Sequence, residues 1–262
     1  MDNKTPGYPQ QDIMYLVETL LPQRNDREHL VEIIKDDEDF IEAMLGDEKL
    51  FDRIMRDEAI LLRVTPKLFF SVLLRQAHKD LQQASYTIEF RSRQKIPVFD
   101  TEQVVDLLED RNICEYLAEM LASFTRIESY TWPVRVRRGV WFKYRFNELD
   151  IDSLIRLSQS VEENYRFALY KRIFLTGMFP EYVQAGSSIP ESLRRKSKKD
   201  LEEYEEEGKQ FYRLAAQHEA AIFMDLSQVL DKLAESFTLA EKPLKFLSEH
   251  YLPTRKHHLF GI

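Results

Sequence analysis

The chain has 262 residues, and its 37 lysines and arginines against 45 aspartates and glutamates give a formal net charge of −8. Hydrophobic residues make up 44% of the sequence, with only 7 glycines and a single cysteine. This composition is typical of a mainly helical globular protein and excludes the collagen-like, low-complexity and disulfide-scaffolded classes. Because no apolar run approaches the roughly 20 residues of a membrane span and Cys114 has no disulfide partner, we expect a cytoplasmic protein that contacts no membrane.

The first part of the chain combines a polar tail with a series of short helices. Residues 1–11 contain two prolines and a glycine and few apolar side chains, so we expect a disordered tail. From 12 to 63, short apolar clusters alternate with breaking residues, which predicts a bundle of short helices. The candidate N-caps in the breaks are Asn25, Asp37 and Asp47.

A longer helix is predicted to follow. Thr65 before Pro66 is a favourable helix start, because a capping hydroxyl precedes a proline at the first helical position. Apolar residues at helical spacing continue to Ile88, which predicts a helix that ends near Arg91. The elements expected after it are a short strand at 96–99, a helix capped by Asp100, a polar break at 109–112 and a helix to Phe124.

The clearest local signal is a β-hairpin at 131–146, where aromatic and β-branched residues alternate with charged residues on both sides of Gly139. A three-residue loop, Arg137 to Gly139, places the apolar residues of both strands on one face, whereas a two-residue loop mixes the faces. Gly139 then occupies the position at which such a loop needs a left-handed residue. The predicted register pairs Val136 with Val140, Val134 with Phe142 and Trp132 with Tyr144.

The remaining residues, 147–262, are predicted to form a helical C-terminal region. Apolar spacing from Ile151 to Ile173 indicates an amphipathic helix, and residues 180–190 are the most loop-like stretch. Helical patterning then resumes at Ser192.

One stretch of this region, 201–230, resembles a single tetratricopeptide repeat. The resemblance rests on the spacing of Tyr204, Gly208, Phe211 and Ala220. It implies two helices that the small glycine brings close together. Because Glu207 departs from the repeat pattern and no second copy is found, an ordinary amphipathic helix pair is the alternative.

The order of elements from 64 to 146 resembles a winged helix, with a helix, a short strand, two helices and a hairpin. In that fold the third helix is the usual recognition helix for DNA, and the hairpin loop is the wing. A helical bundle with an incidental hairpin is the alternative. The predicted divisions are a tail (1–11), a short-helix bundle (12–63), a winged-helix-like segment (64–146) and the C-terminal region (147–262), which can all pack as one domain.

Charge separates two parts of the winged-helix-like segment. Between Asp100 and Glu128, eight acidic residues against two arginines give a net charge of −6, which opposes contact with DNA phosphates. The hairpin is basic, and three interpretations of its outward face are open. The cations can bind nucleic-acid phosphates while the indole stacks on a base, or they can bind an acidic protein surface. The face can also be solvated and bind nothing specific. The candidate partner-binding or anion-binding residues are Arg135, Arg137, Arg138, Trp141, Lys143 and Arg145.

The sequence contains no motif that indicates catalysis or metal binding. His257 and His258 are adjacent but lack a third ligand at a useful spacing, and no glycine-rich phosphate loop or nucleophile motif occurs. We therefore expect no catalytic residues, metal ligands or cofactors, and we expect Cys114 to be a packed core thiol. An enzyme with a dispersed site is an alternative, which predicts a pocket converging on some of His78, His218, Glu115 and Glu119.

These features favour a non-catalytic interaction or regulatory protein that uses the basic hairpin and helical surfaces to bind a partner. The expected partner is another protein or a second copy of the chain, because the acidic segment disfavours DNA. The second hypothesis is a nucleic-acid-binding regulator of the winged-helix type. Nucleic-acid binding measured across salt concentrations separates the two hypotheses.

Overall fold

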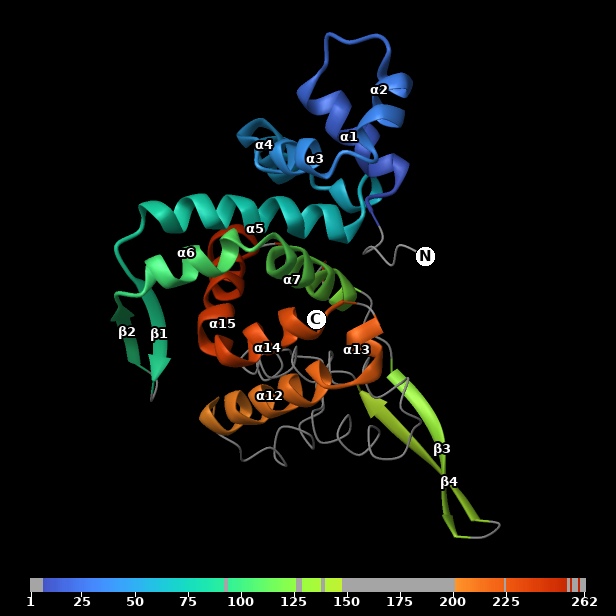
Figure 1. Cartoon of the computed structure of the whole chain (residues 1–262), viewed down its shortest axis with the longest axis vertical. Coiled ribbons are helices and arrows are strands. Elements are labelled where there is room, and N and C mark those ends of the chain that lie inside the picture. The colour runs from blue at the N-terminus through green and yellow to red at the C-terminus, as the bar shows by residue number, and fades with distance from the viewer. Residues whose placement is uncertain are drawn as a thin grey trace. The chain divides into compact units, whose positions relative to one another are not determined.

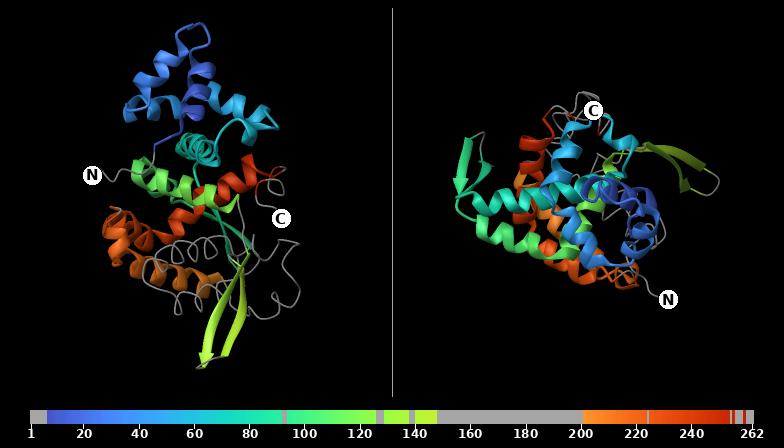
Figure 2. Two further views of the ribbon diagram at one scale, coloured as in Figure 1. Left: turned by 90° about the vertical axis from the view of Figure 1, so that its right-hand side faces the viewer. Right: turned by 90° about the horizontal axis from the view of Figure 1, so that it is seen from above.

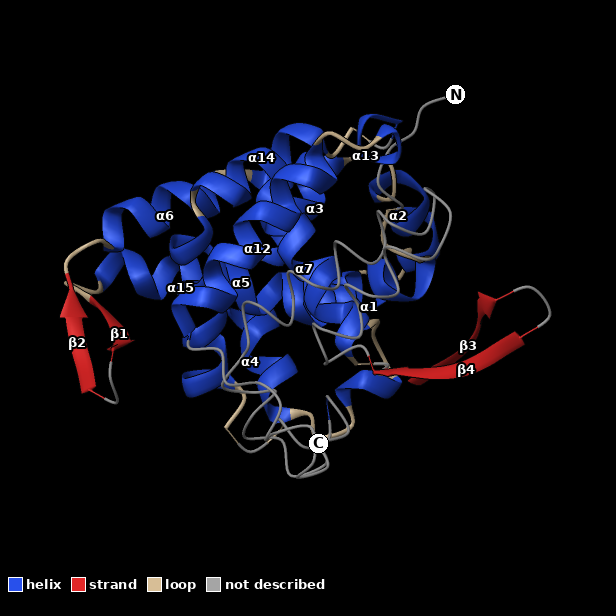
Figure 3. Cartoon of the chain, turned by 90° about the horizontal axis from the view of Figure 1, so that it is seen from below, coloured by secondary structure: helices blue, strands red, loops and turns tan. Residues whose placement is uncertain are grey.

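The computed structural model describes residues 7–91, 94–125, 129–137, 140–147, 201–223, 225–253, 255 and 259. The chain divides into two compact units. The N-terminal unit comprises Lys4–Thr125 and Lys242–Arg255, and the central unit comprises Arg126–Glu241 with both chain ends. The described part is mainly helical, as the composition predicts (Figures 1 and 3). The finer predicted divisions at residues 63 and 146 stay predictions.

Short helices form the first part of the N-terminal unit, as predicted. Asp37 accepts a hydrogen bond from the Phe40 N–H at 2.9 Å and Asp47 accepts one from the Lys49 N–H at 2.8 Å, which confirms two predicted N-caps. The N-cap position of α2 is Asp26 rather than the predicted Asn25, and its side chain makes no cap hydrogen bond. The elements are α1 (Gln10–Leu20), α2 (Arg27–Ile34), α3 (Glu38–Leu45), α4 (Glu48–Arg56) and the 3₁₀-helix η1 (Ile60–Leu62).

The predicted disordered tail is wrong for its last residues. Helix α1 begins at Gln10, and Tyr8 is buried with its hydroxyl donating to Ser71 Oγ at 2.8 Å. Asp12 accepts from the N–H and the hydroxyl of Thr65, at 2.8 and 2.5 Å. Tertiary contacts therefore fix residues whose local composition favours disorder, while residues 1–6 lie outside the described part.

Helix α5 (Pro66–Gln83) is the longest described helix of the N-terminal unit. Thr65 caps it as predicted, because its hydroxyl accepts from the Leu68 N–H at 3.2 Å and Pro66 occupies the first helical position. Two further helices pack along α5 (Figures 1 and 2): α6 (Thr101–Glu109) and α7 (Arg111–Phe124).

Helix α5 ends before the predicted limit at Arg91. It stops at Gln83, and β1 (Thr87–Arg91) pairs antiparallel with β2 (Gln94–Val98). The apolar residues after Gln83 fit a period of two as well as a helical period, and strand pairing decides between them. The predicted single strand at 96–99 is therefore the second strand of a hairpin.

Helix α6 begins directly after Asp100, as predicted, whereas α7 begins at Arg111, within the predicted break at 109–112. Asp110 caps α7 by accepting hydrogen bonds from two N–H groups of its first turn. Asp100 precedes α6, but its carboxylate makes no cap hydrogen bond. It accepts instead from the Thr87 hydroxyl at 2.6 Å and pairs with Lys242. The aspartate thus joins the base of the β1–β2 hairpin to the C-terminal segment.

The C-terminal segment Lys242–Arg255 belongs to the N-terminal unit. It contains the end of α15 (Phe237–Phe246) and the π-helix η2 (Leu247–Tyr251). Polar contacts hold it there: Lys242 with Asp100, the Tyr251 hydroxyl with Asp80 at 2.5 Å, and Arg255 with the carbonyls of Ile54 and Met55 at 3.2 and 2.5 Å. Residues far apart in the sequence therefore build this unit together.

The central unit contains a second hairpin and further helices. Residues 148–200, with the predicted helix at 151–173 and the predicted loop at 180–190, lie outside the described part. The described elements are β3 (Ser129–Arg137), β4 (Val140–Asn147), α12 (Leu201–Ala216), α13 (Glu219–Phe223), α14 (Ser227–Glu235) and the start of α15.

Helix α12 approaches the start of α15 closely at Gly208. A Cβ atom at this position would overlap the ring of Phe237, which is fully buried and meets Tyr212 edge to face at 6.5 Å. The resemblance to a tetratricopeptide repeat implies a close approach at this glycine. The contacting helix is α15, however, and not a second helix within 201–230.

The two hairpins are separate two-stranded sheets. Among the described strands, β1 pairs with β2 in the N-terminal unit and β3 pairs with β4 in the central unit. The resemblance of 64–146 to a winged helix therefore stays a prediction. None of the helices in the described residues has the length and apolar content that crossing a membrane requires.

Candidate functional site

The predicted basic site lies on the β3–β4 hairpin, whose backbone the structure describes except for Arg138 and Gly139. The pairs Trp132–Tyr144 and Val134–Phe142 are confirmed. The predicted pair Val136–Val140 is wrong, because Val140 pairs with Arg137. A bulge between Arg135 and Arg137 gives β3 one extra residue, so the pairing shifts by one residue near the turn.

The register places four of the six predicted site residues in one series of positions. Successive residues of a strand lie on opposite faces, so alternate pairs share a face. One series contains the pairs Thr131–Arg145, Pro133–Lys143 and Arg135–Trp141, and the other contains Tyr130–Phe146, Trp132–Tyr144 and Val134–Phe142. The positions of three cations and Trp141 thus lie on the face opposite the apolar positions. Arg137 lies beyond the bulge, and Arg138 lies outside the described residues.

An ion pair between a buried arginine and a half-buried glutamate joins α5 to α3 in the N-terminal unit. Arg75 donates from Nε and Nη2 to the two carboxylate oxygens of Glu42, at 2.7 and 2.5 Å. Its Nη1 donates to the Ser71 carbonyl at 3.1 Å. All three nitrogens of this guanidinium therefore have protein acceptors, and few of its N–H groups remain to bind a ligand.

Cys114 on α7 lies against this guanidinium, with its Sγ 3.8 Å from Arg75 Nη1. The thiol is buried, and burial raises its pKa. A buried neutral thiol is a poor nucleophile. The prediction that Cys114 is a packed core residue is confirmed.

Two of the other ionisable residues considered for catalysis, Glu119 and His78, interact with side chains of their own unit. Glu119 accepts from Lys67 Nζ at 2.8 Å, which makes it one member of an ion pair rather than of a carboxylate pair with half-buried Glu115. His78 lies one turn from Gln82, with 3.5 Å between their Nε2 atoms. No group of three or more His, Cys, Asp and Glu side chains suited to a metal occurs among the described residues, and His257 and His258 lie outside them.

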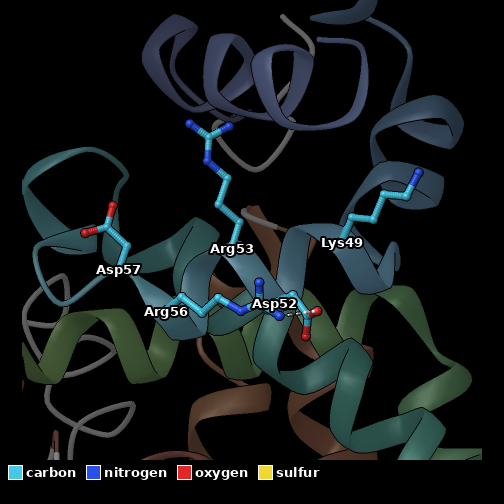
Figure 4. Close-up of a pocket in the computed structure, with 5 residues that line it drawn as sticks. All are labelled: Lys49, Asp52, Arg53, Arg56 and Asp57. Carbon is cyan, nitrogen blue, oxygen red and sulfur yellow. Dashed lines mark hydrogen bonds and ion pairs between the residues drawn. The ribbon is translucent and has the colours of Figure 1, made fainter.

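A surface hollow beside α4 carries mixed charge (Figure 4). The Arg53 side chain extends towards α1, donates to Thr19 Oγ1 at 2.8 Å and lies over the Tyr15 ring at 4.6 Å. Arg56 turns towards Asp52 instead. Because these cations diverge, the hollow does not present a convergent anion site. Its lining residues are Lys49, Asp52, Arg53, Arg56 and Asp57.

The sequence matches no protein-family model, and neither the curated proteins nor the solved structures contain a detectable match to it.

No local sequence pattern identified the Arg75–Glu42 pair. Arg75 follows a continuous run of buried residues in α5, and a cation within such a run signals a buried partner. Glu42 lies on a separate short helix, so its identity as that partner depends on the tertiary fold.

Proposed function

We propose that the protein is a non-catalytic interaction protein whose β3–β4 hairpin binds an acidic surface of a partner protein. The cross-strand register carries the proposal, because it groups the positions of Arg135, Lys143 and Arg145 with Trp141 on one face. Arg137 and Arg138 add positive charge at the turn. An interface of this kind gains association rate from its charges and contact area from the indole.

Charge favours a protein partner over nucleic acid. The chain carries −8 overall, and the segment from Asp100 to Glu128 carries −6. A nucleic acid extends its phosphate charge well beyond the length of one hairpin, so acidic parts of the chain oppose its approach. A compact acidic patch on a protein can contact the hairpin alone.

A synthetic glutamate-rich peptide, titrated into the full chain by calorimetry, tests this proposal. We expect saturable binding that weakens with rising salt, because exposed charges are screened. The double reversal Arg135→Glu with Lys143→Glu should abolish binding, whereas Arg135→Lys with Lys143→Arg keeps the charge and should retain it. A peptide affinity that is equal in both double variants would overturn the proposal.

The second candidate is a nucleic-acid-binding regulator, which the order of elements from α5 to β4 supports. It predicts binding of duplex DNA at low salt. It also predicts a salt dependence that becomes shallower in Arg135→Ala and Lys143→Ala, since each lost phosphate contact lowers the slope by about one. Absence of DNA binding at low salt removes this candidate.

A further inference from the structure

Each of the two hairpins has two outer strand edges, and no further strand pairs with them among the described residues. An open edge presents a row of backbone N–H and C=O groups with which another extended chain can pair. Short strands, prolines and bulges hinder such pairing. Strands β1 and β2 have 5 residues each and β2 contains Pro97, while β3 contains Pro133 and the bulge that follows Arg135.

The edge of β4 carries none of these features. Its 8 residues contain no proline, and the bulge of the described hairpin lies on β3. In Figures 1 and 3, β3 is the only described strand that runs beside β4. Strand β4 therefore has the longest unprotected edge among the described strands.

Pro133 determines which backbone groups of β4 face this edge. Opposite residues in an antiparallel pair alternate between pairs that exchange two N–H···O bonds and pairs that exchange none. Pro133 has no N–H, so its pair with Lys143 is of the second kind, and so is the pair Thr131–Arg145 two residues away. The backbone N–H and C=O groups of Lys143 and Arg145 therefore point away from β3, to the open edge.

The residues at this edge also hold cationic positions of the hairpin. Trp141, Lys143 and Arg145 occupy positions on one face of β4, and Phe142 and Tyr144 occupy positions on the other. Residues of an added strand share a face with the β4 residues that they oppose. A strand in which acidic and apolar residues alternate therefore places its acids opposite the cationic positions and its apolar residues opposite the aromatic ones.

We propose that the open edge of β4 binds an extended segment of the partner protein by strand addition, and that acidic and apolar residues alternate in this segment. The inference rests on the proposed function and specifies the form of its acidic partner. Backbone hydrogen bonds supply affinity in this mode of binding, and the alternating side chains supply specificity.

A second copy of the chain is a less favourable occupant of this edge. Antiparallel pairing of β4 with itself, centred on Lys143, places that lysine opposite its equivalent. Pairing centred on Tyr144 places Lys143 opposite Arg145. Like charges directly opposite each other destabilise a strand pair, whereas an acidic segment replaces this repulsion by attraction.

Calorimetric titration of the full chain at low salt with two peptides of the same composition tests strand addition. Glutamate and valine alternate in one peptide, and they form two separate blocks in the other. We expect the alternating peptide to bind about tenfold more tightly, since each misplaced residue of the block peptide loses a favourable cross-strand pair. Equal affinities overturn strand addition but leave the acidic partner of the proposed function standing. If neither peptide binds, both proposals are wrong.

Backbone methylation of the alternating peptide distinguishes strand addition from charge attraction alone. The glutamates lie opposite the edge residues Lys143 and Arg145, so their N–H groups donate to β4. Methylation of the glutamate nitrogens should therefore abolish binding. Methylation of the valine nitrogens is the matched control and should retain it. Equal affinities of the two methylated peptides contradict strand addition.

Hydrogen exchange of the full chain, followed by NMR, locates the bound edge. The alternating peptide should slow exchange of the Lys143 and Arg145 amides more than exchange of the Phe142 and Tyr144 amides, which face β3. Unaltered exchange at Lys143 in the presence of saturating peptide overturns the proposal. So does a peptide-free chain that sediments as a dimer with the Lys143 amide already protected, because a second copy then occupies the edge.

Discussion

The guanidinium of Arg75 on α5 donates two hydrogen bonds to the carboxylate of Glu42 on α3. The two side chains differ in exposure, at 7% for Arg75 and 31% for Glu42. Loss of the glutamate leaves a buried cation without its counterion, whereas loss of the arginine leaves a carboxylate that water reaches. The two partners therefore differ in the cost of their removal.

Substitution of each partner should reveal this asymmetry. We expect Glu42→Gln to lower the free energy of unfolding by about 2 kcal/mol, and Arg75→Met to lower it by less, because methionine fills part of the buried space without a charge. Urea denaturation measures both values. The control Asp39→Asn, which removes only the largely exposed pair with Arg111, should change little. A greater loss for Arg75→Met than for Glu42→Gln contradicts the argument.

His78 should make stability depend on pH. Burial lowers the pKa of its imidazole below the ordinary value of 6.5, so folding favours the neutral ring. Above pH 6.5 the ring is neutral in both the folded and the unfolded chain, so its burial does not reduce stability. As the pH falls from 6.5 through the lower folded-state pKa, the unfolded chain binds the proton more readily and the free energy of unfolding decreases. His78→Gln should therefore reduce the fall in the urea midpoint on acidification. His29→Gln, at an exposed position, is the matched control. If the urea midpoint of His78→Gln falls with pH as steeply as that of the wild type, this imidazole does not contribute to the pH dependence of stability.

Gly208 should resist replacement by alanine although it lies within α12. Alanine favours a helix by about 1 kcal/mol over glycine, but its Cβ would overlap the buried ring of Phe237. We expect Gly208→Ala to lower the free energy of unfolding, and the smaller side chain of Phe237→Leu to reduce that loss when the two are combined. A double-mutant cycle measures the coupling. Additive effects would mean that the ring does not oppose the Cβ.

Arg255 should stabilise the end of α4. Its guanidinium donates to the carbonyls of Ile54 and Met55 in the last turn of that helix, which lack partners within the helix. We expect Arg255→Met to lower the free energy of unfolding by about 1 kcal/mol and to raise deuterium uptake in α4. Arg56→Met, at an exposed arginine on the same helix, is the comparison and should have a smaller effect. Equal uptake in the two variants would contradict a capping role.

Local sequence signals predicted the elements that local chemistry decides. The caps at Thr65, Asp37 and Asp47 and most of the β3–β4 register follow from hydrogen-bonding groups and alternation within a few residues. The end of α5 could not be predicted in this way, because the apolar residues after Gln83 fit the period of a helix and that of a strand equally well. Pairing with β2 decides in favour of the strand. The bulge in β3 also depends on strand pairing near the turn.

Contacts between distant segments lay beyond sequence reasoning. The burial of Tyr8 depends on Ser71, and the attachment of the C-terminal segment depends on Asp80 and Asp100. No periodicity in the chain identifies such partners. The shared face of Arg135, Trp141, Lys143 and Arg145 follows from the alternation of residues within one hairpin, whereas the role of these residues in binding stays a prediction.

Both tryptophans of the chain, Trp132 and Trp141, lie in the β3–β4 hairpin, so tryptophan emission reports on this hairpin directly. In a Trp132→Phe variant, Trp141 is the single probe, at the position paired with Arg135. Titration with the glutamate-rich peptide should change Trp141 emission in a saturable way that follows the calorimetric binding curve, and Arg135→Glu with Lys143→Glu should remove the change. Peptide binding with unaltered Trp141 emission, or no binding at low salt, would contradict the assignment of this hairpin as the partner-binding surface.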